Sequence, residues 1–412
     1  MIYGTEKKTG ADAPEILEKL QPVATDNRNL TIGLPKAASD DADRRFPLTP
    51  EGAAILVERG YRIKIETGAA ASLHFTDAAY TRAGAEAVSH SETLGADIVI
   101  HMSPLPSCDV MQMRRGTMLL TLLRPESQTR EAIRALLDRH IIAVALDLVQ
   151  DTEGNTPFAD ILSEIDGRTA ITSAASLLSA PYGGKGILLG GVSGIVPCEV
   201  MIIGSGIAAR AAARSAFGLG AMVRMFDNDV YSLRRAARDL GQWVIGSALH
   251  PHVVENAIAS ADVVVNTLPE SSTYGFTVDS DMAARLKREA IVFDLASEPG
   301  SMFPSLRSVP FANAAKGGDD RRVCLTNVGS ATPRTAAMAL TNTFVTLLHD
   351  LTACEGVTNA LRLLPGFQRA AYTFLGKAVN RRIARIADVR AMDINMFLTL
   401  SSWHHRSSVN TT

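Results

Sequence analysis

The stretch EVMIIGSGIAA, residues 199–209, carries the strongest structural signal in this sequence. An apolar strand pattern at 199–203 runs directly into G-x-G-x-x-A, and a helical pattern follows to Leu219. Gly204 permits the tight turn, Gly206 lets the backbone approach a pyrophosphate, and Ala209 lets the helix pack closely on the sheet. The free N–H groups at the start of the helix attract phosphate. We therefore predict a dinucleotide-binding Rossmann unit.

The position of an acidic residue strengthens this prediction. The next apolar strand, 222–226, is followed by Asp227, about 20 positions after Gly204. In dinucleotide-binding proteins an acidic residue at this position accepts hydrogen bonds from the ribose hydroxyls. A carboxylate there repels a 2′-phosphate, so the expected cofactor is NAD(H) rather than NADP(H). Three further residues are expected beside the cofactor: Ser205 in the turn, and Asn266 and Asp294 at the ends of later strands. The alternative is a doubly wound domain that has lost its nucleotide.

The pattern around this unit extends along most of the chain. Apolar strands alternate with helical stretches from Leu30 onward, and the strands are apolar throughout, which indicates parallel sheets covered on both faces. The fold class predicted is α/β, with two doubly wound parallel-sheet domains. The expected division is an N-terminal arm at 1–29, a substrate domain at 30–160, a Rossmann NAD domain at 161–327, and C-terminal helices at 328–412 that return to the substrate domain.

Composition limits the classes of function. The 412 residues are 46% hydrophobic and 5% aromatic, with a net charge of −2, so two large domains are expected and a nucleic-acid partner is not. The four cysteines form no CxxC pair and lack the spacing of zinc ligands, which predicts reduced thiols, no metal and a cytoplasmic protein. We find no signal peptide and no apolar run long enough to enter a membrane.

Five segments match the motifs of one family in the same order, within residues 30–350. They are DRRFPLTP at 43–50 (R-V-x-L-T-P), ETG at 66–68 with FTDAAYTRAGA at 75–85 (E-x-G-A…F-x-D-x-x-Y-x-x-A-G-A), SEIDGR at 163–168 (S-E-I-A-G-R), GKGILLGGVSG at 184–194 (G-x-G-x-L-L-G-G-V-x-G) and NVGSATPRT at 327–335 (N-x-P-x-x-x-P-R-T). On these segments the chain resembles the alanine dehydrogenase family and the related NAD(H)-binding subunit of proton-translocating transhydrogenase. The dehydrogenase is the closer match, because no membrane-spanning region follows.

The resemblance implies a clamshell arrangement of two domains, in which the nucleotide domain is inserted into the sequence of the substrate domain. It also implies a homo-oligomer and a reversible reaction, the NAD-dependent oxidative deamination of L-alanine to pyruvate and ammonia. The small-molecule partner is thus expected to be an amino acid or a 2-oxo acid.

Carried over residue by residue, the resemblance assigns substrate binding to Arg45, whose planar fork suits a carboxylate. The alternative for Arg45 is a salt bridge to the acidic run Asp40, Asp41 and Asp43. His101 and Ser103 stand where the family motif K-V-K-E-P has its two lysines. His101 could titrate near neutral pH, or be a hydrogen-bonded histidine at a strand end, and the sequence favours neither.

Two more positions depart from the family. Arg124 replaces the catalytic histidine of T-Y-L-H-L-A and, being always charged, can bind an anion but cannot shuttle protons. Glu298 replaces the catalytic aspartate of D-I-A-I-D-Q-G-G. The catalytic candidates are therefore Glu298 and His101, and the substrate-binding candidates are Arg45, Ser103 and Arg124.

Three hypotheses follow from these departures. The first is an NAD-dependent dehydrogenase with an altered substrate or rate. The second is an NAD(H)-binding protein, transhydrogenase-like or regulatory, without dehydrogenase activity. The third is a lysine-forming saccharopine dehydrogenase, which shares the fold and also uses a lysine and a histidine. The absence of these two residues here weakens this hypothesis as well.

Overall fold

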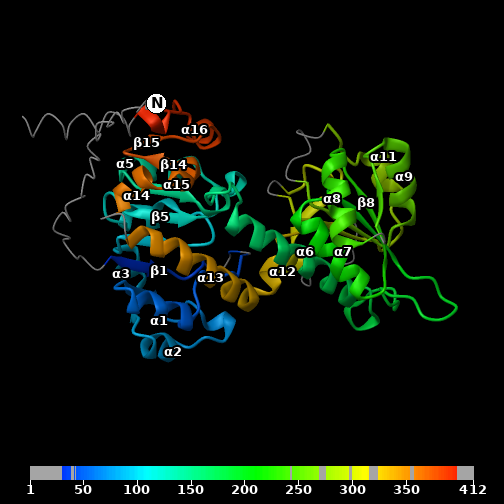
Figure 1. Ribbon diagram of the computed structural model, residues 1–412, viewed down its shortest axis with the longest axis horizontal. Helices are drawn as coiled ribbons and strands as arrows, with labels where there is room; N and C mark the ends of the chain where they lie inside the picture. The colour runs from blue at the N-terminus through cyan, green and yellow to red at the C-terminus, as the bar shows by residue number, and fades with distance from the viewer. Residues whose placement is uncertain are drawn as a thin grey trace, which may run out of the picture.

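The computed structural model describes residues 30–396 apart from 39, 40, 42, 242–243, 269–274, 297–298, 315–322 and 353–356. The predicted N-terminal arm lies outside the described residues. Within them the chain forms two mostly parallel sheets, each covered by helices, in two lobes (Figure 1). The α/β fold class predicted from the alternating apolar strands is confirmed.

The first sheet has eight strands among the described residues, in the order β15-β14-β6-β5-β4-β1-β2-β3. The strands are β1 (Thr31–Leu34), β2 (Arg62–Glu66), β3 (Glu86–Val88), β4 (Ile98–Ile100), β5 (Met118–Thr121), β6 (Ile142–Ala145), β14 (Ala371–Phe374) and β15 (Lys377–Ala378). Its helices are α1 (Pro50–Glu58), α2 (Asp77–Arg82), α3 (His90–Leu94), α4 (Ser107–Gln112), α5 (Arg130–Asp138), α14 (Val357–Leu363), α15 (Pro365–Ala370) and α16 (Arg381–Ala387). The strands from β3 to β6 pair in parallel, so their carboxyl ends share one edge.

The second sheet has seven strands in the described part of the chain, all parallel, in the order β12-β13-β11-β10-β7-β8-β9. The strands are β7 (Glu199–Ile203), β8 (Met222–Phe226), β9 (Ile245–Ser247), β10 (Val263–Asn266), β11 (Ile291–Asp294), β12 (Arg307–Pro310) and β13 (Val323–Thr326). Its helices are α7 (Ile207–Gly218), α8 (Val230–Leu240), α9 (Pro251–Ser260), α11 (Ser280–Ala284) and α12 (Phe311–Ala314). The strand order reverses beside β7, and ligands bind at such a switch point.

Two long helices connect the lobes, α6 (Pro157–Leu177) and α13 (Pro333–Thr352), and Figure 1 shows α6 running from one lobe to the other. The first half of α6 places Phe158 and Leu162 in the core of the first sheet, and its second half places Ala170 and Ala174 in the core of the second. Phe158 also packs on Phe344 of α13, with ring centroids 4.7 Å apart. A single rigid element therefore belongs to both cores.

Parts of the fold differ from the sequence prediction. The tail after residue 350 was expected to be helical, but β14 and β15 extend the first sheet, and β14 pairs antiparallel with β6. The short strands β3, β9 and β12 were not predicted. Each lies at a sheet edge and has no buried residue, so none shows the apolar run by which the buried strands were recognised.

We expect Gly167→Ala to destabilise the protein, because α6 and α7 cross in contact at this residue. A Cβ at position 167 would lie 2.2 Å from the carbonyl oxygen of Ala208. Overpacking of this kind lowers the free energy of unfolding by about 1–3 kcal/mol. Denaturant unfolding followed by circular dichroism measures the change.

Gly218→Ala is the matched control, because it adds the same methyl to a helical glycine with no atom within 4 Å of the new Cβ. Its stability is expected to equal or slightly exceed that of the wild type, since alanine favours the helix. Equal stabilities of the two variants would contradict the close crossing.

Candidate functional site

The glycine turn after β7 is shaped to receive a phosphate. Gly204 has φ +107°, and a Cβ there would lie 2.2 Å from Thr267 Oγ1, so only glycine fits. Gly206 caps the N-terminus of α7, and no atom lies within 4 Å of its hypothetical Cβ. Because glycine has no side chain to cap the helix, the first N–H groups of α7 are open to a ligand. Ala209 is fully buried, as close helix–sheet packing requires.

Asp227 stands at the end of β8, directly beside the turn. The Ser205 hydroxyl donates a hydrogen bond to Asp227 Oδ2 at 2.6 Å, and the Asp229 N–H donates to Asp227 Oδ1 at 2.9 Å. These bonds fix the carboxylate and leave it further lone pairs to accept ribose hydroxyls. The structure thus brings together Ser205, Gly206 and Asp227, which the sequence predicted as neighbours of the cofactor.

A cavity of about 260 Å³ opens in front of this turn. One wall is Ser205, Gly206 and Arg210 at the start of α7, and a second is Ser232 and Arg235 of α8. The segment 154–160, which leads into α6, lines the opposite side. The cavity therefore has hydroxyl, guanidinium and helix N–H donors, which is the set that a pyrophosphate requires.

Asn266 and Asp294 lie at paired positions at the ends of β10 and β11, and both are buried. Asn266 Nδ2 donates to Asp294 Oδ1 at 2.8 Å, and the Gly300 N–H donates to Asp294 Oδ2 at 2.7 Å. Burial raises the pKa of Asp294 above its usual value, although these donors oppose the shift. Asp294 thus holds the segment that follows β11, while Asn266 exchanges hydrogen bonds with Leu268 after β10. Glu298, the predicted catalytic carboxylate in that loop, lies outside the described residues.

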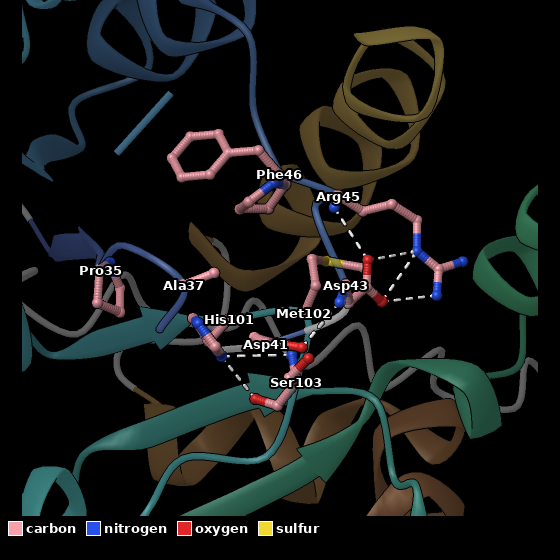
Figure 2. A pocket seen from close by; sticks show the side chains of 10 residues that line it. Pro35, Ala37, Asp41, Asp43, Arg45, Phe46, His101, Met102 and Ser103 are labelled. Atoms are coloured by element: carbon pink, nitrogen blue, oxygen red, sulfur yellow. Dashed lines mark hydrogen bonds and ion pairs between the residues drawn. The ribbon is translucent and has the colours of Figure 1, made fainter. Parts of the chain in front are cut away.

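A second cluster lies in the first lobe, where a buried carboxylate binds two guanidinium groups. Arg45 Nε and Nη2 donate to Asp43 at 2.9 and 2.7 Å, and Arg124 Nη2 donates to the same carboxylate (Figure 2 shows Asp43 and Arg45). Burial alone would raise the pKa of Asp43, but the two guanidinium groups outweigh it and hold that pKa well below its usual range. The salt bridge considered for Arg45 therefore exists with Asp43, while Asp40 lies outside the described residues.

The backbone around Arg124 is held firmly. Arg124 has a left-handed conformation, with φ 37° and ψ 69°, which is unfavourable for a residue with a side chain. The preceding residue is fixed on both sides: the Leu123 N–H donates to Asp147 Oδ1 at 2.8 Å, and its carbonyl accepts from Gln128 Nε2 at 2.9 Å. Sequence reasoning missed Asp147 and Gln128, which have no motif of their own.

His101 and Ser103 follow β4 and line a small cavity with Asp43 and Arg45 (Figure 2). His101 Nδ1 lies 2.6 Å from the Ser103 carbonyl oxygen and 3.3 Å from the Ser103 backbone nitrogen. A carbonyl oxygen can only accept, so the shorter contact assigns the proton to Nδ1 and leaves Nε2 as the acceptor of the neutral ring. Burial lowers the pKa of His101, which keeps the ring neutral near pH 7. Arg124 Nη1 donates to Ser103 Oγ at 3.4 Å.

Asn327, which follows β13, and Asp166 on α6 complete this cluster. Arg45 Nη2 donates to Asn327 Oδ1 at 3.4 Å, and Arg45 Nη1 lies 3.8 Å from Asp166 Oδ1. Asp166 was not among the predicted site residues. The sequence could have identified Asp166, because SEIDGR has an acid where the family motif S-E-I-A-G-R has alanine.

Comparison with known proteins agrees with this architecture. Residues 33–165 match the N-terminal domain, and residues 170–381 the C-terminal domain, of "Alanine dehydrogenase/PNT". The chain belongs to the alanine dehydrogenase/PNT family. The resemblance seen in the sequence motifs is thereby confirmed.

Relatives within the alanine dehydrogenase/PNT family include two proteins named alanine dehydrogenase. The one from Mycolicibacterium smegmatis is 30% identical over 373 residues, covering 90% of this chain and 100% of that protein. The one from Bacillus subtilis is 30% identical over 362 residues, covering 86% and 94%.

Solved structures give the same fold. An L-alanine dehydrogenase matches with a TM-score of 0.75 and 25% identity, covering 87% of this chain and 99% of the other. The transhydrogenase from Sinorhizobium meliloti matches with a TM-score of 0.67 and 20% identity, covering 85% and 99%. Among the described helices of this chain, none is both long and apolar enough to cross a membrane.

We expect Asp43→Asn to destabilise the protein, because it leaves two partly or fully buried guanidinium groups without their carboxylate. Removing one member of a buried ion pair costs about 3–5 kcal/mol. The folded state lowers the pKa of Asp43. The contribution of Asp43 to the free energy of unfolding is therefore complete above the ordinary aspartate pKa of about 4 and is lost as the pH falls below that value. The stability difference between wild type and variant should therefore be constant near neutral pH and shrink in acid.

Urea unfolding at several pH values measures this difference, and Glu58→Gln, an exposed change on α1, is the control. A difference that grew as the pH fell would contradict the assignment.

Proposed function

We propose that this protein is an NAD-dependent dehydrogenase that interconverts an amino acid with its 2-oxo acid and ammonia. The observation that carries the proposal is the cluster of Arg45 and Arg124 around Asp43, beside Asn327. Two guanidinium groups and one carboxylate leave one positive charge, which suits one carboxylate of a substrate. Arg45 Nη1 has no hydrogen bond among the described residues, so a donor is left for that ligand.

The residues around the glycine turn fit NAD. The N–H groups of α7 and the guanidinium of Arg210 would hold the pyrophosphate, and Asp227 would accept the ribose hydroxyls. The buried carboxylate of Asp227 disfavours a 2′-phosphate. When bound, NAD supplies the acceptor for the hydride that leaves the substrate Cα.

The substrate-binding residues favour a substrate other than alanine. Ser103 has no charge to hold a carboxylate, whereas Arg124 places a second guanidinium group in the cluster. We propose that Arg45 and Arg124 together hold a bulkier or more acidic 2-oxo acid than pyruvate. His101, neutral and with Nε2 as acceptor, and Glu298 are the proposed acid–base residues of this site.

One observation favours a second candidate, an NAD(H)-binding protein without dehydrogenase activity. The Asp43 carboxylate already binds both guanidinium groups, as a substrate carboxylate would, while the family's lysine and histidine are replaced. A transhydrogenase-like or regulatory protein would need the glycine turn and not these residues.

A turnover assay separates the two candidates. Purified protein with NADH, ammonium and a panel of 2-oxo acids is followed at the nicotinamide absorbance band. We expect turnover, with a 2-oxo acid bulkier than pyruvate exceeding pyruvate itself, because Ser103 and Arg124 stand where the family has a lysine and a histidine. NADH binding without turnover on any acid would instead establish the second candidate.

We expect Asp227→Asn to weaken NADH binding by about tenfold or more, because a charged hydrogen bond to the ribose contributes about 1.5–3 kcal/mol. Fluorescence titration with NADH measures the dissociation constant. Asp281→Asn, an exposed acid on α11 of the same lobe, is the matched control and should bind NADH like the wild type. Unchanged affinity in Asp227→Asn would remove the cofactor assignment.

A further inference from the structure

Asp166 lies on α6 at the junction of the two lobes, and one of its carboxylate oxygens has an unusual environment. Its side chain as a whole is 23% exposed, but Oδ1 is buried and has no hydrogen-bond partner among the described residues. A buried carboxylate oxygen without a donor is unfavourable, and such atoms in native proteins commonly serve a ligand or a reaction.

The surroundings of Asp166 Oδ1 place it beside Arg45 of the proposed substrate site. Arg45 Nη1 is 3.8 Å away, too far for a hydrogen bond but close enough for a strong charge interaction. On the other side, a Cβ at Gly329 would lie 1.7 Å from this oxygen, so the carboxylate fits only because residue 329 is glycine. Asp166 on α6 thus faces Arg45 from one side and Gly329 from the other.

The other described acids near Arg45 and Arg124 are committed to protein partners. Asp43 binds two guanidinium groups, which keep it ionised. Asp41 accepts from the Asp43 N–H at 2.8 Å, and Asp147 accepts from the Leu123 N–H. His101 lines the same small cavity as Arg45, but its ring is neutral and its proton is on Nδ1, bound to the Ser103 carbonyl oxygen, so it can accept a proton and has none to donate to the ligand. Asp166 is therefore the described carboxylate that can exchange a proton with a ligand held by Arg45.

We propose that Asp166 donates a hydrogen bond, and then its proton, to the carbonyl oxygen of a 2-oxo acid whose carboxylate is bound by Arg45 and Arg124. This inference rests on the proposed function. As the ammonia nitrogen forms its bond to the carbonyl carbon, the carbonyl π pair takes the proton of Asp166 and becomes a hydroxyl. One proton of the new ammonium group then returns to the Asp166 carboxylate, so the amino alcohol forms without net loss of a proton.

The charges around Asp166 suit a group that changes its protonation state. Burial raises the pKa of Asp166 and Asp43 raises it further, while Arg45, Arg124 and a backbone hydrogen bond from Gly329 lower it without reversing the shift. Asp147, on the segment that packs against α6, acts on Arg124. Asp166 thus keeps a proton at a higher pH than an exposed aspartate, and Arg45 stabilises the carboxylate that remains after the proton leaves.

Proton uptake on ligand binding tests the proposal without requiring turnover. Oxamate, an inert analogue of a 2-oxo acid, is titrated calorimetrically into the protein with NADH, in two buffers of different ionisation enthalpy. The wild type should take up as much as one proton at a pH above the pKa of Asp166. Its affinity should fall up to about tenfold per pH unit, because only the protonated acid donates to the ligand. Asp166→Asn keeps an amide donor but should take up close to none.

Glu164→Gln is the matched control, since it removes an exposed carboxylate from the same helix. It should bind oxamate and take up protons like the wild type. Equal proton uptake by wild type and Asp166→Asn would overturn the assignment of Asp166, because a purely structural carboxylate would not couple to the ligand's proton.

Kinetics of the amination direction supply the second readout. With the best 2-oxo acid, Asp166→Asn should lower kcat by about 100-fold or more, as for loss of a general acid, and leave KM within about threefold. A kcat within threefold of the wild type would overturn the role of Asp166 and leave the dehydrogenase function intact. In a third outcome, the wild type shows no turnover but takes up a proton when it binds oxamate, and Asp166→Asn does not take up this proton. That outcome would refute the dehydrogenase function and support Asp166 as the proton donor to the ligand. No oxamate binding by the wild type would overturn both.

Discussion

The buried carboxylate of Asp43 is the constraint on which the substrate-side site depends. It joins Arg45, which follows β1, to Arg124, which follows β5, and so fixes two loops at the carboxyl edge of one sheet. Two guanidinium groups withdrawn from water are unfavourable unless a carboxylate compensates them. The same bonds orient the guanidinium planes, and the left-handed backbone of Arg124 is tolerated because Asp147 and Gln128 hold the residue before it.

The second constraint is that α6 belongs to both cores. Neighbouring residues of this helix face the two halves of the site: Asp166 approaches Arg45, and Gly167 lies against Ala208 at the start of α7. The glycine turn that would hold the pyrophosphate is thereby connected, through one turn of helix, to the charges that would hold the substrate. Hydride transfer needs the two ligands placed to within fractions of an ångström, and a rigid helix provides that better than a loop.

The parts of the protein that could be predicted from sequence are those encoded locally. The glycine turn, its strand and helix, and Asp227 lie in one continuous segment, and each residue type has a physical reason to stand where it does. The inner strands were recognised by their apolar runs, while the edge strands β3, β9 and β12 escaped because none of their residues is buried. The strands β14 and β15 were missed because they lie in the tail that was expected to be helical, although β14 is buried throughout. Asp43 was noticed only as a competitor for Arg45, and Asp166 was passed over inside a matching motif.

The sequence by itself determined the α/β class, the nucleotide-binding pattern and the family, because hydrophobic period and turn chemistry act over a few residues. The tertiary structure decided which charges meet. Asp43 is only two residues from Arg45, but Arg124, Asp166 and Asn327 are far away along the chain, and their encounter with this pair depends on strand order and on the path of α6. That packing gives Asp43 its second guanidinium group and leaves one buried oxygen of Asp166 unpaired, and this difference separates a structural acid from one that can exchange a proton.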